Sequence, residues 1–151
     1  MNRMNIWDRI GKSLPYFSII TGVTLIDQAV KYRAEKHPEE FRGVIRNTGF
    51  AGERLNERPD IVRKTAVILT ALGLARLVVM EDDNVSDRGI KTGWAFVMGG
   101  ALSNTLDRVL RKYVVDYIPH GKYVYNLGDI SIYSGLVTTV LSLFFSGKGK
   151  E

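Results

Sequence analysis

The chain has 151 residues, contains no cysteine and carries a formal net charge of +5. This length suits a single domain over residues 1–151, and no flexible linker divides it. The lack of cysteine excludes disulfide scaffolds, thiolate metal sites and cysteine nucleophiles, while His37 and His120 lie far apart in sequence and do not suggest a zinc site. A basic chain suits nucleic acid or an anionic lipid surface, so charge informs on association rather than fold.

The first 15 residues do not have the pattern of a cleavable signal peptide. They contain three basic residues, Arg3, Arg9 and Lys12, together with Asp8, and no small-residue cleavage site follows them. We therefore expect any membrane segment to remain in the mature chain.

Four apolar stretches follow in the chain, at residues 16–30, 66–80, 93–106 and 130–145. Each is long enough for a helix but slightly shorter than the roughly 17–25 residues that cross a bilayer. The mean hydropathy of −0.04 is also low for a protein with several membrane spans. Length alone therefore leaves both a soluble helical bundle and a four-span membrane bundle open.

The segments between these stretches, residues 31–64, 81–91 and 109–128, contain helix-breaking and charged residues. Weak alternation in FRGVIRN predicts a small extended element over residues 41–45. The polar tail, residues 146–151, indicates a solvated chain end.

If the four stretches cross a membrane, the basic residues near their ends predict the orientation. The basic N-terminus favours the cytoplasm, and an even number of spans returns the C-terminus, with Lys148 and Lys150, to the same side. This orientation places a set of polar residues together at the outer face: Asp27, Lys31, Asn104, Asp107, Arg108 and Asp129. Ionisable groups in or beside a span are costly, so such a set indicates a functional site.

Helical spacing suggests partners within this set. Asp27 and Lys31 are four residues apart and would face each other on a helix, as would Asn104 and Arg108. A structural role is the stronger interpretation for these residues, because a pair with this spacing is commonly a solvated helix face. For Asp107, beside Arg108, ion pairing is a stronger interpretation than catalysis.

Asp116, in VVDYIP, and Asp129, in YNLGDIS, lie beside polar breaks and could point into a shared cavity. Two carboxyl groups held close cannot both ionise, so one can activate water while its protonated partner polarises a carbonyl, as in aspartic peptidases. The alternative is that Asp116 is an ordinary loop acid and Asp129 the N-cap of the last helix. The residues by themselves leave both interpretations open.

Two stretches resemble the strongest signatures of bacterial lipoprotein signal peptidases, also called signal peptidase II. These are GGALSNTLDRVLRKYVVDYI at residues 99–118 and YNLGDISIYSG at residues 125–135. The sequence DQAVK at residues 27–31 is similar to a DxxxK element of that family, and NTG at residues 47–49 to its NxG element. Four motifs therefore occur in the family's order.

The resemblance implies a mainly α fold, a four-helix transmembrane bundle with a small extracytoplasmic β or loop element after the first helix. It implies an aspartic endopeptidase without metal or organic cofactor, with Asp116 and Asp129 as the catalytic pair. The residues that it implies as support for the pair or the substrate are Asn104, Asp107, Arg108, Asn126, Asn47, Asp27 and Lys31.

The implied substrates are prolipoproteins that carry a diacylglyceryl group, cut just before the lipidated cysteine. The implied location is the bacterial cytoplasmic membrane, with both termini in the cytoplasm and the active site at the extracytoplasmic face. We expect a monomer that contacts membrane lipid and no nucleic acid.

The chain also departs from the family pattern. Ser103 stands where the family has Gly, Gly128 where it has Ala, and the loop at residues 47–58 is unusually charged. These differences leave open a paralogue with altered specificity, or one that binds lipidated peptide or lipid without cutting it. A soluble basic module that binds nucleic acid is a further rival, although the sequence lacks a recognition motif for it.

Overall fold

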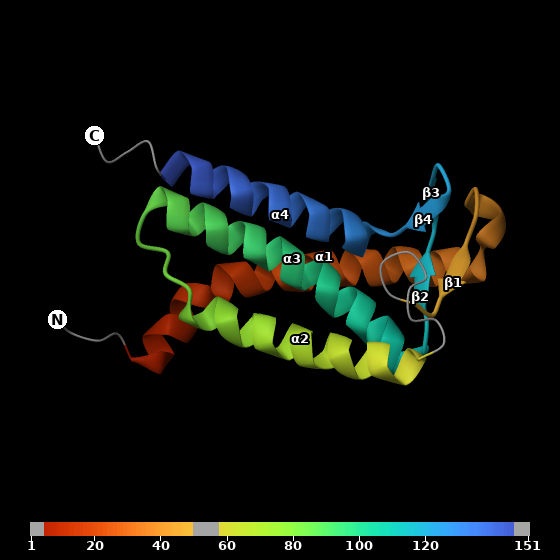
Figure 1. Ribbon diagram of the computed structural model, residues 1–151, viewed down its shortest axis with the longest axis horizontal. Coiled ribbons are helices and arrows are strands. Elements are labelled where there is room, and N and C mark those ends of the chain that lie inside the picture. Colours follow the sequence, from red (N-terminus) through yellow and green to blue (C-terminus); the bar gives the residue numbers. More distant parts are fainter. Residues whose placement is uncertain (1–4, 50–57, 147–151) are drawn as a thin grey trace.

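A computed structural model describes residues 5–49 and 58–146, so most of the loop at 47–58 and of the tail at 146–151 lies outside the described residues. The elements, in chain order, are α1 (Ile6–Lys36), the 3-10 helix η1 (Pro38–Glu40), β1 (Ile45–Asn47), α2 (Pro59–Val79), α3 (Val85–Leu110), β2 (Val114–Asp116), β3 (Ile118–His120), β4 (Tyr123–Tyr125) and α4 (Leu127–Ser146). In Figure 1 the four long helices lie side by side, and the strands gather at the end opposite the start of α1 and the end of α4.

Each predicted apolar stretch is helical apart from Met80, and each helix begins before its stretch; polar side chains cap the first turns of α1 and α3. Asn5 accepts a hydrogen bond from the backbone N–H of Asp8, and Asn84 accepts one from that of Asp87, both at 2.9 Å. Pro59 occupies the first turn of α2, where its missing N–H costs nothing. At about 1.5 Å per residue, even the 20-residue α4 is about 30 Å long, close to the thickness of a bilayer core.

Helix α3 lies at the centre of the bundle and packs against α1, α2 and α4. Its contact with α4 is close because glycines face each other. A Cβ placed on Gly135 would lie 2.4 Å from the carbonyl oxygen of Gly93, and one placed on Gly93 would lie 2.6 Å from that of Gly135. Small residues let helix backbones approach in this way where the driving force is packing rather than water exclusion.

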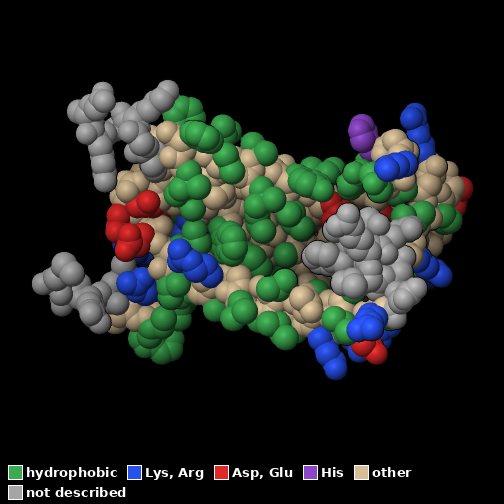
Figure 2. Space-filling view, viewed as in Figure 1, with side chains coloured by type: hydrophobic (Ala, Val, Ile, Leu, Met, Phe, Trp, Pro, Cys, Tyr) green, Lys and Arg blue, Asp and Glu red, His purple; other side chains and the backbone are tan. Residues whose placement is uncertain are grey.

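The bundle has a polar interior and an apolar exterior. Among the described residues, thirteen buried side chains are polar or charged and eleven are hydrophobic, the reverse of the usual preference in soluble proteins. Large hydrophobic side chains are exposed along α2 and α4, and Figure 2 shows them over the middle of the molecule with charged side chains toward its two ends. Within the described chain, α4 alone is long and apolar enough, over Leu127–Phe145, to cross a membrane by length and composition.

The strands form two small antiparallel pairs at one end of the bundle. β1 pairs with β2, placing Ile45 opposite Asp116 and Asn47 opposite Val114, while β3 and β4 form a hairpin. A β element after the first long helix is therefore confirmed. Its predicted bounds, residues 41–45, are wrong, because the 3-10 turn before Phe41 delays the strand and Phe41 packs instead against the ring of Tyr117, at 5.7 Å.

Candidate active site

Asp116 is the last residue of β2 and is almost fully buried, with 2% of its surface exposed. Its Oδ1 accepts a hydrogen bond from Asn126 Nδ2 at 2.6 Å, and its Oδ2 accepts one from Asn47 Nδ2 at 3.0 Å. The pairing of β1 with β2 carries Asn47 to this position. Asp116 is therefore a held, buried carboxyl group rather than an ordinary loop acid.

Asp129 lies in the first turn of α4 and forms a reciprocal capping box with Asn126. The backbone N–H of Asp129 donates to Asn126 Oδ1 at 2.9 Å, and the backbone N–H of Asn126 donates to Asp129 Oδ2 at 3.2 Å. The other oxygen, Oδ1, accepts from Asn104 Nδ2 at 2.9 Å. The alternative that made Asp129 the N-cap is wrong, because Asn126 occupies that position and Asp129 is the third residue of the helix.

One amide side chain joins the two acids. Asn126 is fully buried and donates through Nδ2 to Asp116, while its Oδ1 accepts from the backbone of Asp129. The chain folds back between them through the β3–β4 hairpin, and the backbone N–H of Tyr117 donates to the carbonyl of Tyr125 at 2.8 Å. Two acids thirteen positions apart in sequence are thus brought to the same end of the bundle.

Burial raises the pKa of Asp116 from its usual 3.8 to about 6. Hydrogen bonds from the amides of Asn47 and Asn126 oppose this rise, as does the charge of Lys31, whereas the charge of Asp129 adds to it. The two acids are therefore close enough to influence each other's ionisation. Such a pair retains a proton at higher pH than an isolated carboxyl group would.

Lys31 has no exposed surface. Its ammonium group contacts Asn104 Oδ1 at 2.7 Å, Asp27 Oδ2 at 2.8 Å and Asp107 Oδ2 at 3.0 Å. Asp27 and Asp107 are also fully buried. The interpretation of Asp27 and Lys31 as a solvated helix pair is therefore wrong, and Lys31 links this cluster to the amide that holds Asp129.

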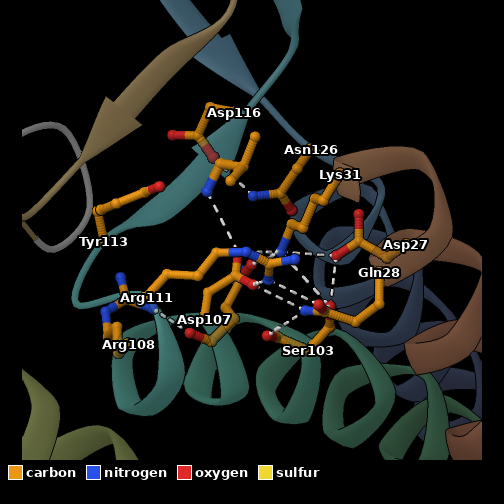
Figure 3. Close-up of polar contacts among 12 residues, drawn as sticks. Asp27, Gln28, Lys31, Ser103, Asp107, Arg108, Arg111, Tyr113, Asp116 and Asn126 are labelled. Carbon is orange, nitrogen blue, oxygen red and sulfur yellow. Dashed lines mark hydrogen bonds and ion pairs between the residues drawn. The ribbon is translucent and has the colours of Figure 1, made fainter. Parts of the chain in front are cut away.

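Asp107 lies in the cluster between Lys31 and Arg111, as Figure 3 shows. It pairs with the guanidinium group of Arg111, accepts from Gln28 Nε2 at 2.8 Å, and accepts from the backbone N–H of Val115 at 3.2 Å. The last contact anchors the strand residue before Asp116. The structure confirms the predicted ion pairing of Asp107, with Lys31 and Arg111 as the partners. The roles of Gln28 and Arg111 were not predicted, although the four-residue spacing of Asp107 and Arg111 was a usable signal.

Arg108 ties the end of α3 to the segment after β1. Its Nη1 donates to the carbonyl of Asn104 at 3.2 Å and its Nη2 to the carbonyl of Gly49 at 3.1 Å. The structure thereby joins all nine predicted site residues through shared contacts at one end of the bundle: Asp27, Lys31, Asn47, Asn104, Asp107, Arg108, Asp116, Asn126 and Asp129.

Ser103 and Gly128, two of the departures from the family pattern, lie next to the same carboxyl oxygen. Ser103 Oγ donates to Asp27 Oδ2 at 2.6 Å, and a Cβ placed on Gly128 would lie 2.9 Å from that oxygen. The hydroxyl of Tyr117 donates to the other oxygen of the same carboxylate, Asp27 Oδ1, at 2.9 Å. Tyr117 was not predicted as a site residue, because no pattern in the sequence places it there. Over residues 5–49 and 58–146, no group of three or more His, Cys, Asp or Glu is arranged to hold a metal ion.

Comparison with known proteins identifies one family. Residues 19–145 match the family model described as signal peptidase (SPase) II. A lipoprotein signal peptidase of Aquifex aeolicus (strain VF5) is 32% identical over 87% of this chain and 86% of its own length, and one of Geobacillus kaustophilus (strain HTA426) is 29% identical over 91% of this chain and 100% of its own length. A solved bacterial membrane enzyme shares the fold, with a TM-score of 0.73, 23% identity and coverage of 91% of this chain and 92% of that one.

Proposed function

Since this chain belongs to the signal peptidase II family, we propose that it removes signal peptides from prolipoproteins by aspartic chemistry, with Asp116 and Asp129 as the catalytic pair. The observation that carries the proposal is the contact of both acids with Asn126, which supports a joint role for them. If Asp129 served only to cap α4, its contacts with Asn126 would be explained. The burial of Asp116, which contacts the same asparagine, would not.

In the proposed reaction, the oxygen of a water molecule attacks the scissile carbonyl while the ionised acid of the pair takes a proton from that water. The protonated partner donates a hydrogen bond to the developing oxyanion and its proton then goes to the leaving amine. The raised pKa of Asp116 supports this scheme, because a carboxyl group must keep a proton near neutral pH to act as the donor. Asn47, Asn104 and Asn126 hold the acids in place through amide donors.

We also propose that all four long helices cross the membrane. The exposed hydrophobic side chains support this, because they lie along the outer faces of the helices while the polar side chains lie inside. On α2 and α4, these exposed residues are Ile61, Val67, Ile68, Leu69, Leu72, Val79, Ile130, Tyr133, Leu136, Val137, Val140, Leu141, Leu143, Phe144 and Phe145. A lipid environment would make this arrangement favourable, whereas water would penalise it.

The proposed substrate is a prolipoprotein that bears a diacylglyceryl group, cut just before the lipidated cysteine, and the proposed site faces the extracytoplasmic side of the bacterial cytoplasmic membrane. The names of the relatives support the prolipoprotein. The diacylglyceryl group and the position of the cut are proposed because the resemblance of the motifs implies them. We further propose that the chain works as a monomer with both termini in the cytoplasm.

The test replaces each acid with Asn and measures cleavage of a diacylglyceryl prolipoprotein by the purified full chain in bilayers. Asp116→Asn and Asp129→Asn should each lower kcat by at least about a hundredfold, because each removes a group that handles a proton. The matched control is Asp87→Asn. At the start of α3, at the opposite end of the bundle, the backbone N–H of Asp87 likewise donates to Asn84 Oδ1, while Asn84 Nδ2 donates to Asp87 Oδ2, so Asp87→Asn should retain activity.

Near-normal cleavage by Asp129→Asn would exclude the proposed pair. If the wild-type chain bound the lipidated peptide but gave no product, the result would favour a paralogue that binds without cutting. Equal losses in Asp129→Asn and Asp87→Asn would show that helix capping, rather than proton transfer, explains the effect.

A further inference from the structure

The hydroxyl group of Tyr117 lies between the buried cluster and the start of α4. Tyr117 directly follows Asp116 in sequence and has 5% of its surface exposed. Its hydroxyl donates to Asp27 Oδ1 at 2.9 Å and accepts from the backbone N–H of Leu127 at 3.1 Å. Leu127 is the first residue of α4, two positions before Asp129. Tyr117 is therefore joined to Asp116 through the backbone and to the first turn of α4, which carries Asp129, through a hydrogen bond.

The direction of these hydrogen bonds is determined by their partners. A backbone N–H can only donate, so the hydroxyl of Tyr117 must accept from Leu127 and use its single proton toward Asp27. Burial and the nearby charge of Asp27 raise the pKa of Tyr117, so the group remains a phenol over the working pH range. The arrangement has no alternative orientation that keeps both contacts.

Asp27 is itself held firmly, so it can serve as an anchor for this hydroxyl. Its other oxygen, Oδ2, contacts the ammonium group of Lys31 at 2.8 Å and the hydroxyl of Ser103 at 2.6 Å. A side chain on residue 128 would crowd the same oxygen, and Gly128 leaves that space open. Residues of α1 and α3 therefore hold this carboxylate independently of Tyr117.

The contact with Leu127 also meets a need of the helix. The first N–H groups of a helix have no partner within it and must find one elsewhere. Asn126 satisfies the N–H of Asp129, and Tyr117 satisfies that of Leu127. The position of the first turn of α4, which carries Asp129, is therefore determined partly by the phenol next to Asp116.

We propose that Tyr117 is a positioning residue that sets the separation of Asp116 and Asp129 through its hydroxyl group; as a statement about catalysis, this inference rests on the proposed function. Its basis is the geometry of the Asp27–Tyr117–Leu127 contacts. A displacement of about 1 Å between reacting groups can cost about a hundredfold in rate. The hydroxyl therefore matters to the reaction although it need not touch the substrate.

The test variant is Tyr117→Phe, which removes one oxygen and keeps the ring that packs against Phe41. We expect kcat to fall by roughly tenfold to a hundredfold while KM changes by less than about threefold. The alkaline limb of the pH profile should move to lower pH, because acids that lie farther apart repel each other less and release the shared proton more readily. The matched control is Tyr113→Phe, which removes a phenol that donates to Glu35 at 2.6 Å at the same end of the bundle and should leave all three values unchanged.

Hydrogen exchange supplies a readout that does not depend on activity. In Tyr117→Phe the N–H groups at the start of α4 should exchange at least about tenfold faster than in the wild type, because Leu127 loses its acceptor. Tyr113→Phe should show no such change. If Tyr117→Phe reduces the yield of folded protein, Leu127→Pro breaks the same hydrogen bond from the other side, at a helix position that tolerates proline, and should lower kcat in the same way.

The outcomes separate this inference from the proposed function. Wild-type kcat and an unchanged pH profile in folded Tyr117→Phe would overturn the positioning role, even if exchange at α4 became faster. Unchanged exchange at α4 would overturn it as well. A wild-type chain without any cleavage would exclude the proposed function, and the exchange measurement would then still decide whether the hydroxyl holds the first turn of α4.

Discussion

Replacing Lys31 with Met should lower the free energy of unfolding of the protein, although the substitution preserves much of the side-chain volume. Lys31 places one ammonium group within 3.0 Å of both Asp27 and Asp107, and none of the three side chains is exposed. Without it, Asp27 has no cation partner among residues 5–49 and 58–146, while Asp107 keeps Arg111. Removal of one member of a buried ion pair costs about 3–5 kcal/mol, because the remaining charge stays in a medium that solvates it poorly.

This magnitude corresponds to a decrease of roughly two to four powers of ten in the ratio of folded to unfolded protein. The matched control is Lys12→Met at the opposite end of the bundle. Lys12 has 47% of its side chain exposed and lies 3.5 Å from Asp83 and 4.0 Å from Asp82, so this variant should lose less than about 1 kcal/mol.

The assay is equilibrium unfolding of the purified chain in detergent, followed by the fluorescence of Trp94, whose Nε1 donates to the carbonyl of Gly73 at 2.9 Å between α2 and α3. A second substitution tests the cause. Asp27→Asn added to Lys31→Met removes the uncompensated charge and should recover part of the loss. A stability of Lys31→Met within about 1 kcal/mol of wild type, or no recovery in the double variant, would refute the electrostatic reasoning.

Two further predictions concern pH and helix packing. Because the pKa of Asp116 is about 6 when folded and 3.8 ordinarily, the folded state binds more protons, and the free energy of unfolding should fall by up to about 3 kcal/mol as pH rises from about 4 to 6. Asp116→Asn should lack this fall; an identical pH dependence in both proteins contradicts the assignment. Gly135→Ala should cost about 1–3 kcal/mol in thermal unfolding, because its Cβ would meet the Gly93 carbonyl, whereas Gly22→Ala, with nothing within 4 Å, should be neutral or slightly stabilising. Equal effects of the two alanines would argue against close packing of α3 on α4.

Much of the helical framework could be predicted from the chain because it depends on local properties. Apolar runs marked all four long helices, while polar caps such as Asn84 with Asp87 decided where a helix begins. The motif resemblance led to nine residues that the structure joins at one end of the bundle. The strand after α1 was predicted less well, since its bounds depend on pairing with β2 and on the packing of Phe41 against Tyr117.

The low mean hydropathy of the chain has a structural origin. Helices α1 and α3 contain many polar residues, but these side chains lie inside the bundle, among them Asp27, Lys31, Ser103 and Asp107. An average over the sequence cannot distinguish a polar side chain that faces a neighbouring helix from one that faces the surroundings. Only the packing of the helices shows that the exterior is apolar.

The amino-acid sequence by itself determined the helices, their caps and the types of residue available for chemistry, because these depend on neighbours within a few positions. Tertiary structure alone decided that Asn126 contacts both acids, that Lys31 is buried between two carboxylates, and that Tyr117 holds the start of α4. The contact of Tyr117 with Asp27 joins residues 90 positions apart, and such contacts form only when the β hairpin and the close approach of α3 and α4 bring distant segments together.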